Sequence, residues 1–174
     1  MGGAVLLVDY NPGWPGRFEA ERALVATALG VERACIEHIG STAVPGLGAK
    51  PVIDMMAGVA VLDDVLTRVS DMEAAGYEYV PEYEAQIPLR RYFRKPFLGP
   101  RTVHLHCVVR GGEHWVRHLA FRDYLRAHPD AARAYLDLKQ ALARSHDKAA
   151  YTDAKGPFIE AVVARALDRG AEGA

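Results

Sequence analysis

The segment from His38 to Asp54 constrains the fold and the function of this chain more than any other. Its residue pattern is typical of a strand end, a tight Gly40-Ser41 turn, a loop rich in glycine, and a second apolar strand that carries one acid. Backbone N–H groups in a Gly-Ser turn are able to close around a phosphate group. The segment therefore predicts a phosphate-binding turn between two strands of one sheet.

Several side chains in this segment suit a phosphorylated ligand. Asp54 supplies a carboxylate for a divalent metal, and we predict Asp54 and Ser41 as catalytic residues. A lone acid in an apolar strand is costly unless it is paired, metal-bound or protonated. A structural Asp54 that caps the glycine loop is the alternative. The predicted substrate-binding residues of the segment are His38, Gly40, Ser41, Thr42 and Lys50.

Two histidines share one face of the strand expected over 102–109. Side chains alternate along a strand, so His104 and His106 point to the same side. Histidines at this spacing are able to share a metal, contact a phosphate, or bond to Asp54 if the two strands are neighbours. We predict Asp54, His104 and His106 as ligands of a divalent metal (Mg²⁺, Mn²⁺ or Zn²⁺). Half-buried histidines bonded to the helical part of the chain are the alternative.

Further candidate cations lie outside this segment. Arg91 belongs to a basic cluster between residues 90 and 101, and Lys155 lies near a helix start, where the helix dipole favours anions. We predict that both bind the substrate, with ordinary solvated side chains as the alternative. Lys139 and Arg144, on the preceding helix, allow the same two interpretations.

Length and composition favour one soluble domain over residues 1–174. The chain has 174 residues, enough for a sizeable core, and a net charge of −1, which gives no basic field for nucleic acid. No apolar run approaches the roughly 20 residues of a membrane-spanning helix, and the run at 4–8 is too short for a signal peptide. Cys35 and Cys107 indicate buried free thiols. We therefore expect a cytoplasmic protein that does not bind membranes.

Hydrophobic periodicity divides the chain into a mixed α/β part over 1–111 and a helical part over 112–170. The expected strands are 34–39, 52–59, 77–80, 90–95 and 102–109. The expected helices are 15–29, a segment from Leu62 until Gly76, 113–127, 130–145 and 154–167. The first helix should bury Phe18, Leu24 and Val25, which recur at helical spacing.

These motifs together resemble the GrpB family along nearly the whole chain. They are Asn-Pro-Gly-Trp-Pro at 11–15, the segment 38–54, Val-His-Leu-His at 103–106, Phe-Arg-Asp-Tyr-Leu-Arg at 121–126, and the segment 151–159. The resemblance implies an α/β (α+β) nucleotidyltransferase-like fold of the DNA-polymerase-beta-like superfamily: a mixed sheet with flanking helices and a C-terminal helical segment. Members of that superfamily use a Gly-Ser turn for the triphosphate and three carboxylates for two metals, which stabilise nucleotidyl transfer.

The chain departs from this superfamily pattern at its carboxylates. Asp54 stands at the first position, Met56 occupies the second, and His104 and His106 occupy the later strand. Imidazole is a softer ligand that favours zinc or other transition metals. The resemblance implies a protein that binds a nucleotide or another phosphorylated small molecule, with nucleotidyl transfer at an altered metal site. The alternative is a non-catalytic partner or chaperone-like module linked to coenzyme A metabolism, because related domains are joined to dephospho-coenzyme A kinase.

Overall fold

A computed structural model describes residues 6–96, 98–145 and 148–172. In this part of the chain, five strands form a mixed sheet in the order β1-β2-β5-β4-β3. They are β1 (Ile36–Ile39), β2 (Ile53–Val59), β3 (Glu78–Tyr79), β4 (Arg91–Lys95) and β5 (Val103–Val109). The central strands β2 and β5 run parallel, and every other neighbouring pair is antiparallel. The predicted mixed sheet is therefore confirmed.

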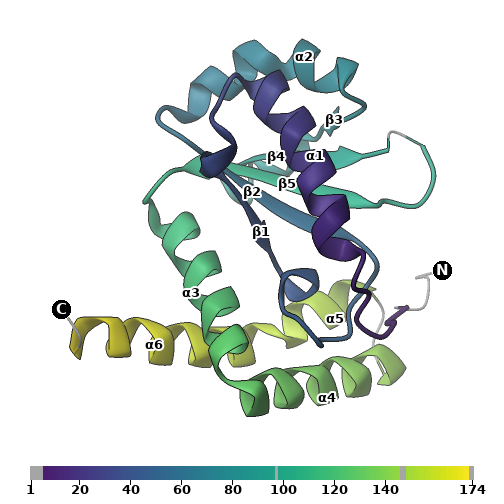
Figure 1. The fold of residues 1–174 in the computed structure, drawn as a ribbon, viewed down its shortest axis with the longest axis vertical. Helices are drawn as coiled ribbons and strands as arrows, with labels where there is room; N and C mark the ends of the chain where they lie inside the picture. Colours follow the sequence, from purple (N-terminus) through teal and green to yellow (C-terminus); the bar gives the residue numbers. More distant parts are fainter. Residues whose placement is uncertain (1–5, 97, 146–147, 173–174) are drawn as a thin grey trace.

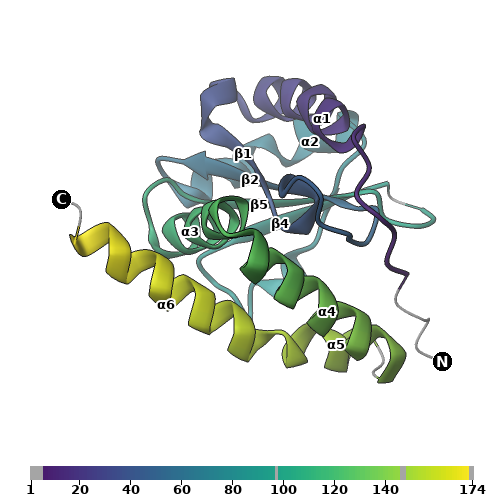
Figure 2. The same ribbon diagram turned by 60° about the horizontal axis from the view of Figure 1, so that its bottom comes forward.

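Helices cover both faces of this sheet. They are α1 (Trp14–Leu29), α2 (Val69–Ala74), α3 (Glu113–Ala127), α4 (Pro129–Ser145), α5 (Lys148–Ala154) and α6 (Gly156–Glu172). Figure 1 and Figure 2 show α1 and α2 over one face, α3 against the other, and α4 to α6 grouped beyond α3. Within the described ranges, no helix combines the length and the apolar character needed to cross a membrane.

Alternation along the central strands sends side chains into separate cores. Met55 and Leu105, both fully buried, pack beneath α1, whereas Met56 packs on the opposite face against Trp115 of α3. A third cluster joins the loop at 44–47 to α3, α4 and α6. The loop that follows the Gly-Ser turn is therefore fixed to the helical part of the chain.

The strands match the predicted ranges closely, whereas three helical segments differ. Residues Leu62–Arg68 form a 3₁₀ helix, and the α-helix begins only at Val69. The segment Lys148–Ala154, for which no element was expected, forms α5. Helix α6 begins at Gly156 and extends beyond the expected end at 167. Apolar spacing marks a buried face but does not separate a 3₁₀ turn from an α-helical one.

Two expectations about burial were wrong. Leu24 is 47% exposed, because it lies on the side of α1 that faces away from the sheet, while its neighbours Phe18 and Val25 are buried. Cys35 is only partly buried, because it lies in a 3₁₀ turn before β1. Cys107 is buried in β5 as expected, and both thiols are free.

Gly40 determines how the chain leaves β1. Its backbone has φ 70° and ψ −171°, a combination that is essentially restricted to glycine. A Cβ atom at this position would lie 2.8 Å from Oδ2 of Asp54. The Gly-Ser turn and the Asp54 carboxylate are therefore in close contact, and only glycine leaves room for it.

We expect Gly40→Ala to lower the free energy of unfolding more than Gly46→Ala does. Both glycines have positive φ, so either alanine introduces backbone strain of about 1–3 kcal/mol. A Cβ atom at Gly46 meets nothing within 4 Å, whereas one at Gly40 meets Asp54. Urea denaturation of both variants measures the difference. Equal losses would contradict a close contact between Gly40 and Asp54.

Candidate functional site

The Gly-Ser turn, the loop before β2 and the helical part of the chain enclose a small polar cavity. Its volume is about 80 Å³. Pockets for whole ligands are usually about 300–1,000 Å³, so this cavity has the size of a subsite for one chemical group. Three lysines contribute to its wall, and we call it the lysine cavity. The residues that line it are Ser41, Thr42, Ala49, Lys50, Asp54, Lys139, Tyr151 and Lys155.

The turn at one wall of the cavity is a short 3₁₀ helix, Ser41–Ala43. The N–H groups of Ala43 and Val44 donate to the carbonyl oxygens of Gly40 and Ser41. The first N–H groups of such a turn have no partner within the turn itself. Because Ser41 and Thr42 line the cavity, the structure brings both predicted binding residues together with Lys50 and Lys155.

Lys139 of α4 reaches into this site from the helical part of the chain. Its Nζ donates to Oγ of Ser41 at 3.0 Å and to the carbonyl oxygen of Gly48 at 2.5 Å. The residue is only 2% exposed, and burial, with the charge of Lys155, lowers its pKa to about 7. Lys139 was not among the residues predicted to bind substrate. One signal was available, because Lys139 follows the buried Tyr135 by four positions and so shares its inward-facing side of α4.

Tyr151 of α5 holds two further lysines near the cavity. The Nζ atoms of Lys50 and Lys155 each lie 4.4 Å from the centre of the Tyr151 ring, a cation–π distance. Burial lowers the pKa of Lys155 to about 8, and the charge of Lys50 adds to this shift while Asp54 opposes it. Burial is the main cause of the lowered pKa values of Lys139 and Lys155, and repulsion from a neighbouring lysine adds to each shift, so an anion would stabilise the site.

Asp54 and His104 form a hydrogen-bonded pair beside the cavity. The parallel register of β2 and β5 places them directly opposite each other, and Nδ1 of His104 lies 3.0 Å from Oδ1 of Asp54. Burial alone would raise the pKa of Asp54, but the hydrogen bond with His104 holds it below its usual value. An ionised carboxylate only accepts hydrogen bonds, so Nδ1 of His104 donates. Nε2 of a neutral His104 ring is then a proton acceptor.

The structure does not join His106 to this pair as a third ligand. His106 shares the face of Asp54, but its Nδ1 lies 3.2 Å from an Arg90 nitrogen, and burial lowers its pKa to about 3. Across the described ranges, no three His, Cys, Asp or Glu side chains are arranged to hold a metal ion. Met56, at the second carboxylate position, is fully buried. These residues do not fit the two-metal site that the resemblance implies, and binding of Mg²⁺, Mn²⁺ or Zn²⁺ stays a prediction.

His38, which is predicted to contact the substrate, lies outside the lysine cavity. His38 pairs with Met55 across β1 and β2, so its side chain points to the α1 face, away from Asp54. There its ring stacks on Phe18 at 4.7 Å, and its Nε2 lies 2.9 Å from Oγ1 of Thr42. Burial lowers the pKa of His38 to about 4, which keeps the ring neutral. His38 therefore supports Thr42 from behind instead of lining the lysine cavity.

Arg91, which is also predicted to bind the substrate, lies outside the lysine cavity as well. Arg91 pairs with Cys107 in the β4–β5 register, so it points to the face opposite His106. Its guanidinium forms ion pairs with Asp63 at 2.8 Å and Glu84 at 3.4 Å. Two carboxylates therefore balance its charge, and it takes no part in the lysine cavity.

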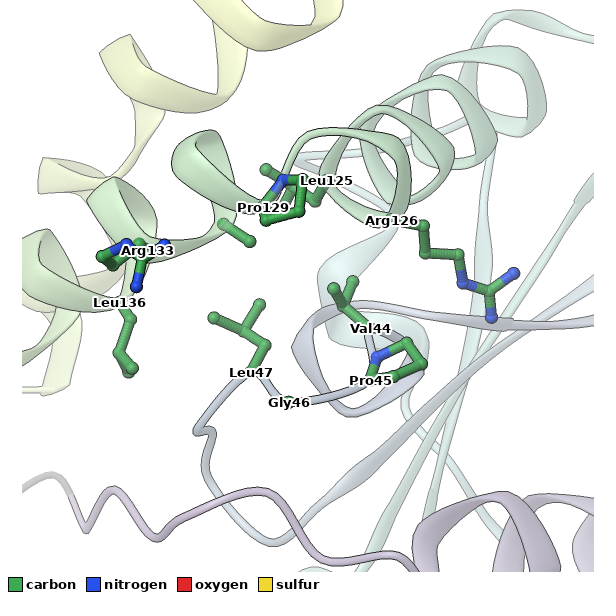
Figure 3. Close-up of a pocket in the computed structure, with 10 residues that line it drawn as sticks. Val44, Pro45, Gly46, Leu47, Leu125, Arg126, Pro129, Arg133 and Leu136 are labelled. Carbon is green, nitrogen blue, oxygen red and sulfur yellow. The ribbon is translucent and has the colours of Figure 1, made fainter.

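A larger cavity, of about 500 Å³, lies between the loop at 44–47 and helices α3 and α4. Figure 3 shows Leu47 pointing toward the helices across this space, while Arg126 is directed away from its centre. Its walls are mainly apolar, and they include none of the histidines or carboxylates of the site. Groups able to bind phosphate gather in the smaller lysine cavity, beside the Asp54–His104 pair, and this cavity is therefore the candidate site.

Comparison with known proteins gives matches along most of the chain. Residues 4–165 match the family model described as GrpB protein. The chain is 34% identical over 168 residues to the glutamate-rich protein GrpB of Alkalihalophilus pseudofirmus, covering 92% of this chain and 95% of that protein. It is 41% identical over 166 residues to a UPF0157 protein of Pseudomonas aeruginosa, covering 92% and 67% of the two chains.

A solved structure and longer relatives complete this comparison. The conserved protein GrpB from Enterococcus faecalis has a TM-score of 0.84 and 37% sequence identity, covering 94% of this chain and 98% of that chain. The chain is also 30% identical over 188 residues to a dephospho-CoA kinase of Mycolicibacterium paratuberculosis, and it spans 46% of that protein. It spans 40% of the UPF0157 protein YqkA of Bacillus subtilis. From its sequence and its fold, the chain belongs to the GrpB family.

Proposed function

We propose that this protein binds a phosphorylated small molecule, such as a nucleotide, with one phosphate group in the lysine cavity. The environment of Lys139 is the observation that carries this proposal. Its ammonium group is buried against Ser41, and in the described part of the chain no carboxylate forms an ion pair with it. A buried charge without a counter-charge is unfavourable. A phosphate would supply both the negative charge and the acceptor oxygens.

The remainder of the ligand lies outside the cavity in this proposal. A volume of about 80 Å³ suits a phosphate group but not a sugar and a base. The hydroxyl of Ser41, the N–H groups at the start of its turn, and Lys155 would surround the phosphate. Asp54 lines the same cavity and is hydrogen-bonded to His104.

The Asp54–His104 pair favours a catalytic role over binding alone. With Nδ1 donating to Asp54, Nε2 of His104 has the geometry of a general base held in one tautomer. We propose that His104 accepts the proton of an attacking hydroxyl. A new O–P bond to the nucleotidyl group then forms as the bond to the leaving pyrophosphate breaks. This assigns the chemical step to residues of this chain and requires no second carboxylate at Met56.

A non-catalytic module is the second candidate function. The resemblance to dephospho-CoA kinases of two mycobacterial species favours a link with coenzyme A metabolism, although kinase activity belongs to those proteins. Such a module would bind a phosphorylated ligand without transferring a group. We place either activity in the cytoplasm, where phosphorylated metabolites are available and free thiols persist.

We expect Lys139→Gln to weaken binding of ATP by about tenfold or more, because a charge-assisted hydrogen bond contributes about 1.5–3 kcal/mol. Arg133→Gln is the matched control. It removes the same charge from the same helix, at a side chain that is 72% exposed. Isothermal titration calorimetry measures both affinities. Equal affinities in the two variants would contradict a phosphate site at Lys139.

Sulfate binding should weaken as pH rises from about 6 to about 9, because sulfate keeps its charge while the lysines lose protons. In the free protein Lys139 has a pKa of about 7 and Lys155 of about 8. A bound anion favours the charged lysines, so binding is strongest below these values and requires proton uptake above them. The affinity should then fall by about tenfold per pH unit for each proton taken up. Calorimetry across the range, with Lys139→Met as the comparison, tests this. An affinity of the wild-type protein for sulfate that does not change over this pH range would rule out binding by these lysines.

Transfer of label from a nucleoside triphosphate to cell-extract acceptors should fall by about a hundredfold or more in Asp54→Asn and His104→Gln, the loss typical of a missing general base. His128→Gln is the control, since His128 bonds to the carbonyl oxygen of Tyr124 at the end of α3. Transfer that persists in His104→Gln would remove His104 from the mechanism. Binding without transfer in the wild-type protein would support the non-catalytic module.

A further inference from the structure

Arg90 is a partly buried cation at the edge of the candidate site. It directly precedes β4, and its guanidinium carbon lies 5.2 Å from the centre of the Tyr92 ring. One of its terminal nitrogens lies 3.2 Å from Nδ1 of His106. Its Nε is buried and has no hydrogen-bond partner within the described ranges. Tyr92 pairs with His106 in the sheet, so Arg90 lies on the face that carries Asp54.

The neighbouring arginines are electrostatically balanced, and Arg90 is not. Arg91 pairs with two carboxylates on the other face, and Arg94 forms two hydrogen bonds with Glu78. In the part of the chain that the structure describes, no carboxylate is within ion-pair distance of Arg90. Burial lowers the pKa of Arg90, which reflects the cost of this unpaired charge.

The groups packed around Arg90 offer no negative charge at neutral pH. His106 offers no negative charge in either protonation state, and neither does His118 of α3, whose ring lies 6.1 Å from the ring of His106. Tyr83 faces Tyr92 at 5.3 Å, and burial keeps the Tyr92 hydroxyl protonated. Asp54, a carboxylate on this face, is bonded to His104.

A continuous series of contacts connects Arg90 with the reaction centre. The Tyr92 ring lies beneath Arg90 and 5.8 Å from the ring of His104, which in turn bonds to Asp54 at 3.0 Å. A guanidinium is a planar set of donors that matches the oxygens of a carboxylate or a phosphate. We propose that Arg90 forms a second oxyanion subsite, which binds a carboxylate or phosphate group of the acceptor molecule. The assignment of this group to the acceptor rests on the proposed function, whereas the anion site itself does not.

The Nε–H signal of Arg90 in ¹H–¹⁵N spectra of the wild-type protein tests this proposal directly. Addition of sodium acetate or of inorganic phosphate should shift this signal with saturation, because an anion bound at the terminal nitrogens changes the electronic environment of the whole guanidinium group. Arg91 is the internal control, since its Nε is also buried without a partner while its charge is balanced. The Arg90 signal is identified because it is absent from the spectrum of the Arg90→Lys variant. An Arg90 signal that moves with neither anion, or only together with that of Arg91, would overturn the proposal.

Variants separate this subsite from the lysine cavity. Arg90→Gln should weaken acetate binding by about tenfold or more, and Arg91→Gln should leave it unchanged. Whichever anion, acetate or phosphate, binds to the wild-type protein with the higher affinity distinguishes a carboxylate acceptor from a phosphorylated one. In Lys139→Gln the Arg90 signal should still respond to acetate, whether or not sulfate binding is lost. A response that disappears in Lys139→Gln would show that Arg90 only reports on the lysine cavity, and would contradict a second subsite.

Discussion

The parallel pairing of β2 with β5 is the interaction on which the whole site depends. Its register sets Asp54 opposite His104 on one face and Met55 opposite Leu105 on the other. A slip of one residue would send the carboxylate into the apolar core and Met55 into the polar site. The core beneath α1 therefore holds the Asp54–His104 pair in place. Gly40 completes the arrangement, because its missing side chain lets the turn after β1 approach Asp54.

The helical part of the chain completes this site instead of only adding to the core. Lys139 of α4 bonds to Ser41, although 98 positions separate them in the sequence. Tyr151 and Lys155 reach the same cavity from α5 and the residue that follows it. An anion that neutralises these lysines would therefore stabilise the contact between the helices and the sheet. By linkage, ligand binding and the docking of these helices favour each other.

The sequence was sufficient where local pattern determines the outcome. Alternation along one strand predicted that His104 and His106 share a face, and the Gly40-Ser41 pair predicted the turn. The sequence was insufficient where the register between strands, or contact with a distant helix, determines which way a side chain points. His38 and Arg91 point to the α1 face because of pairings that no local pattern fixes. Lys139 and Lys155 looked alike as helical lysines. The spacing from Tyr135 indicates the inward face of α4, and the packing of α4 on the turn buries Lys139 against Ser41.

A crystal structure grown with tungstate, a phosphate analogue that scatters X-rays anomalously, would test the central claim most directly. The account predicts an anomalous peak in the lysine cavity, within hydrogen-bond distance of Oγ of Ser41 and Nζ of Lys139. A cavity that stays empty while tungstate binds elsewhere on the protein would contradict it.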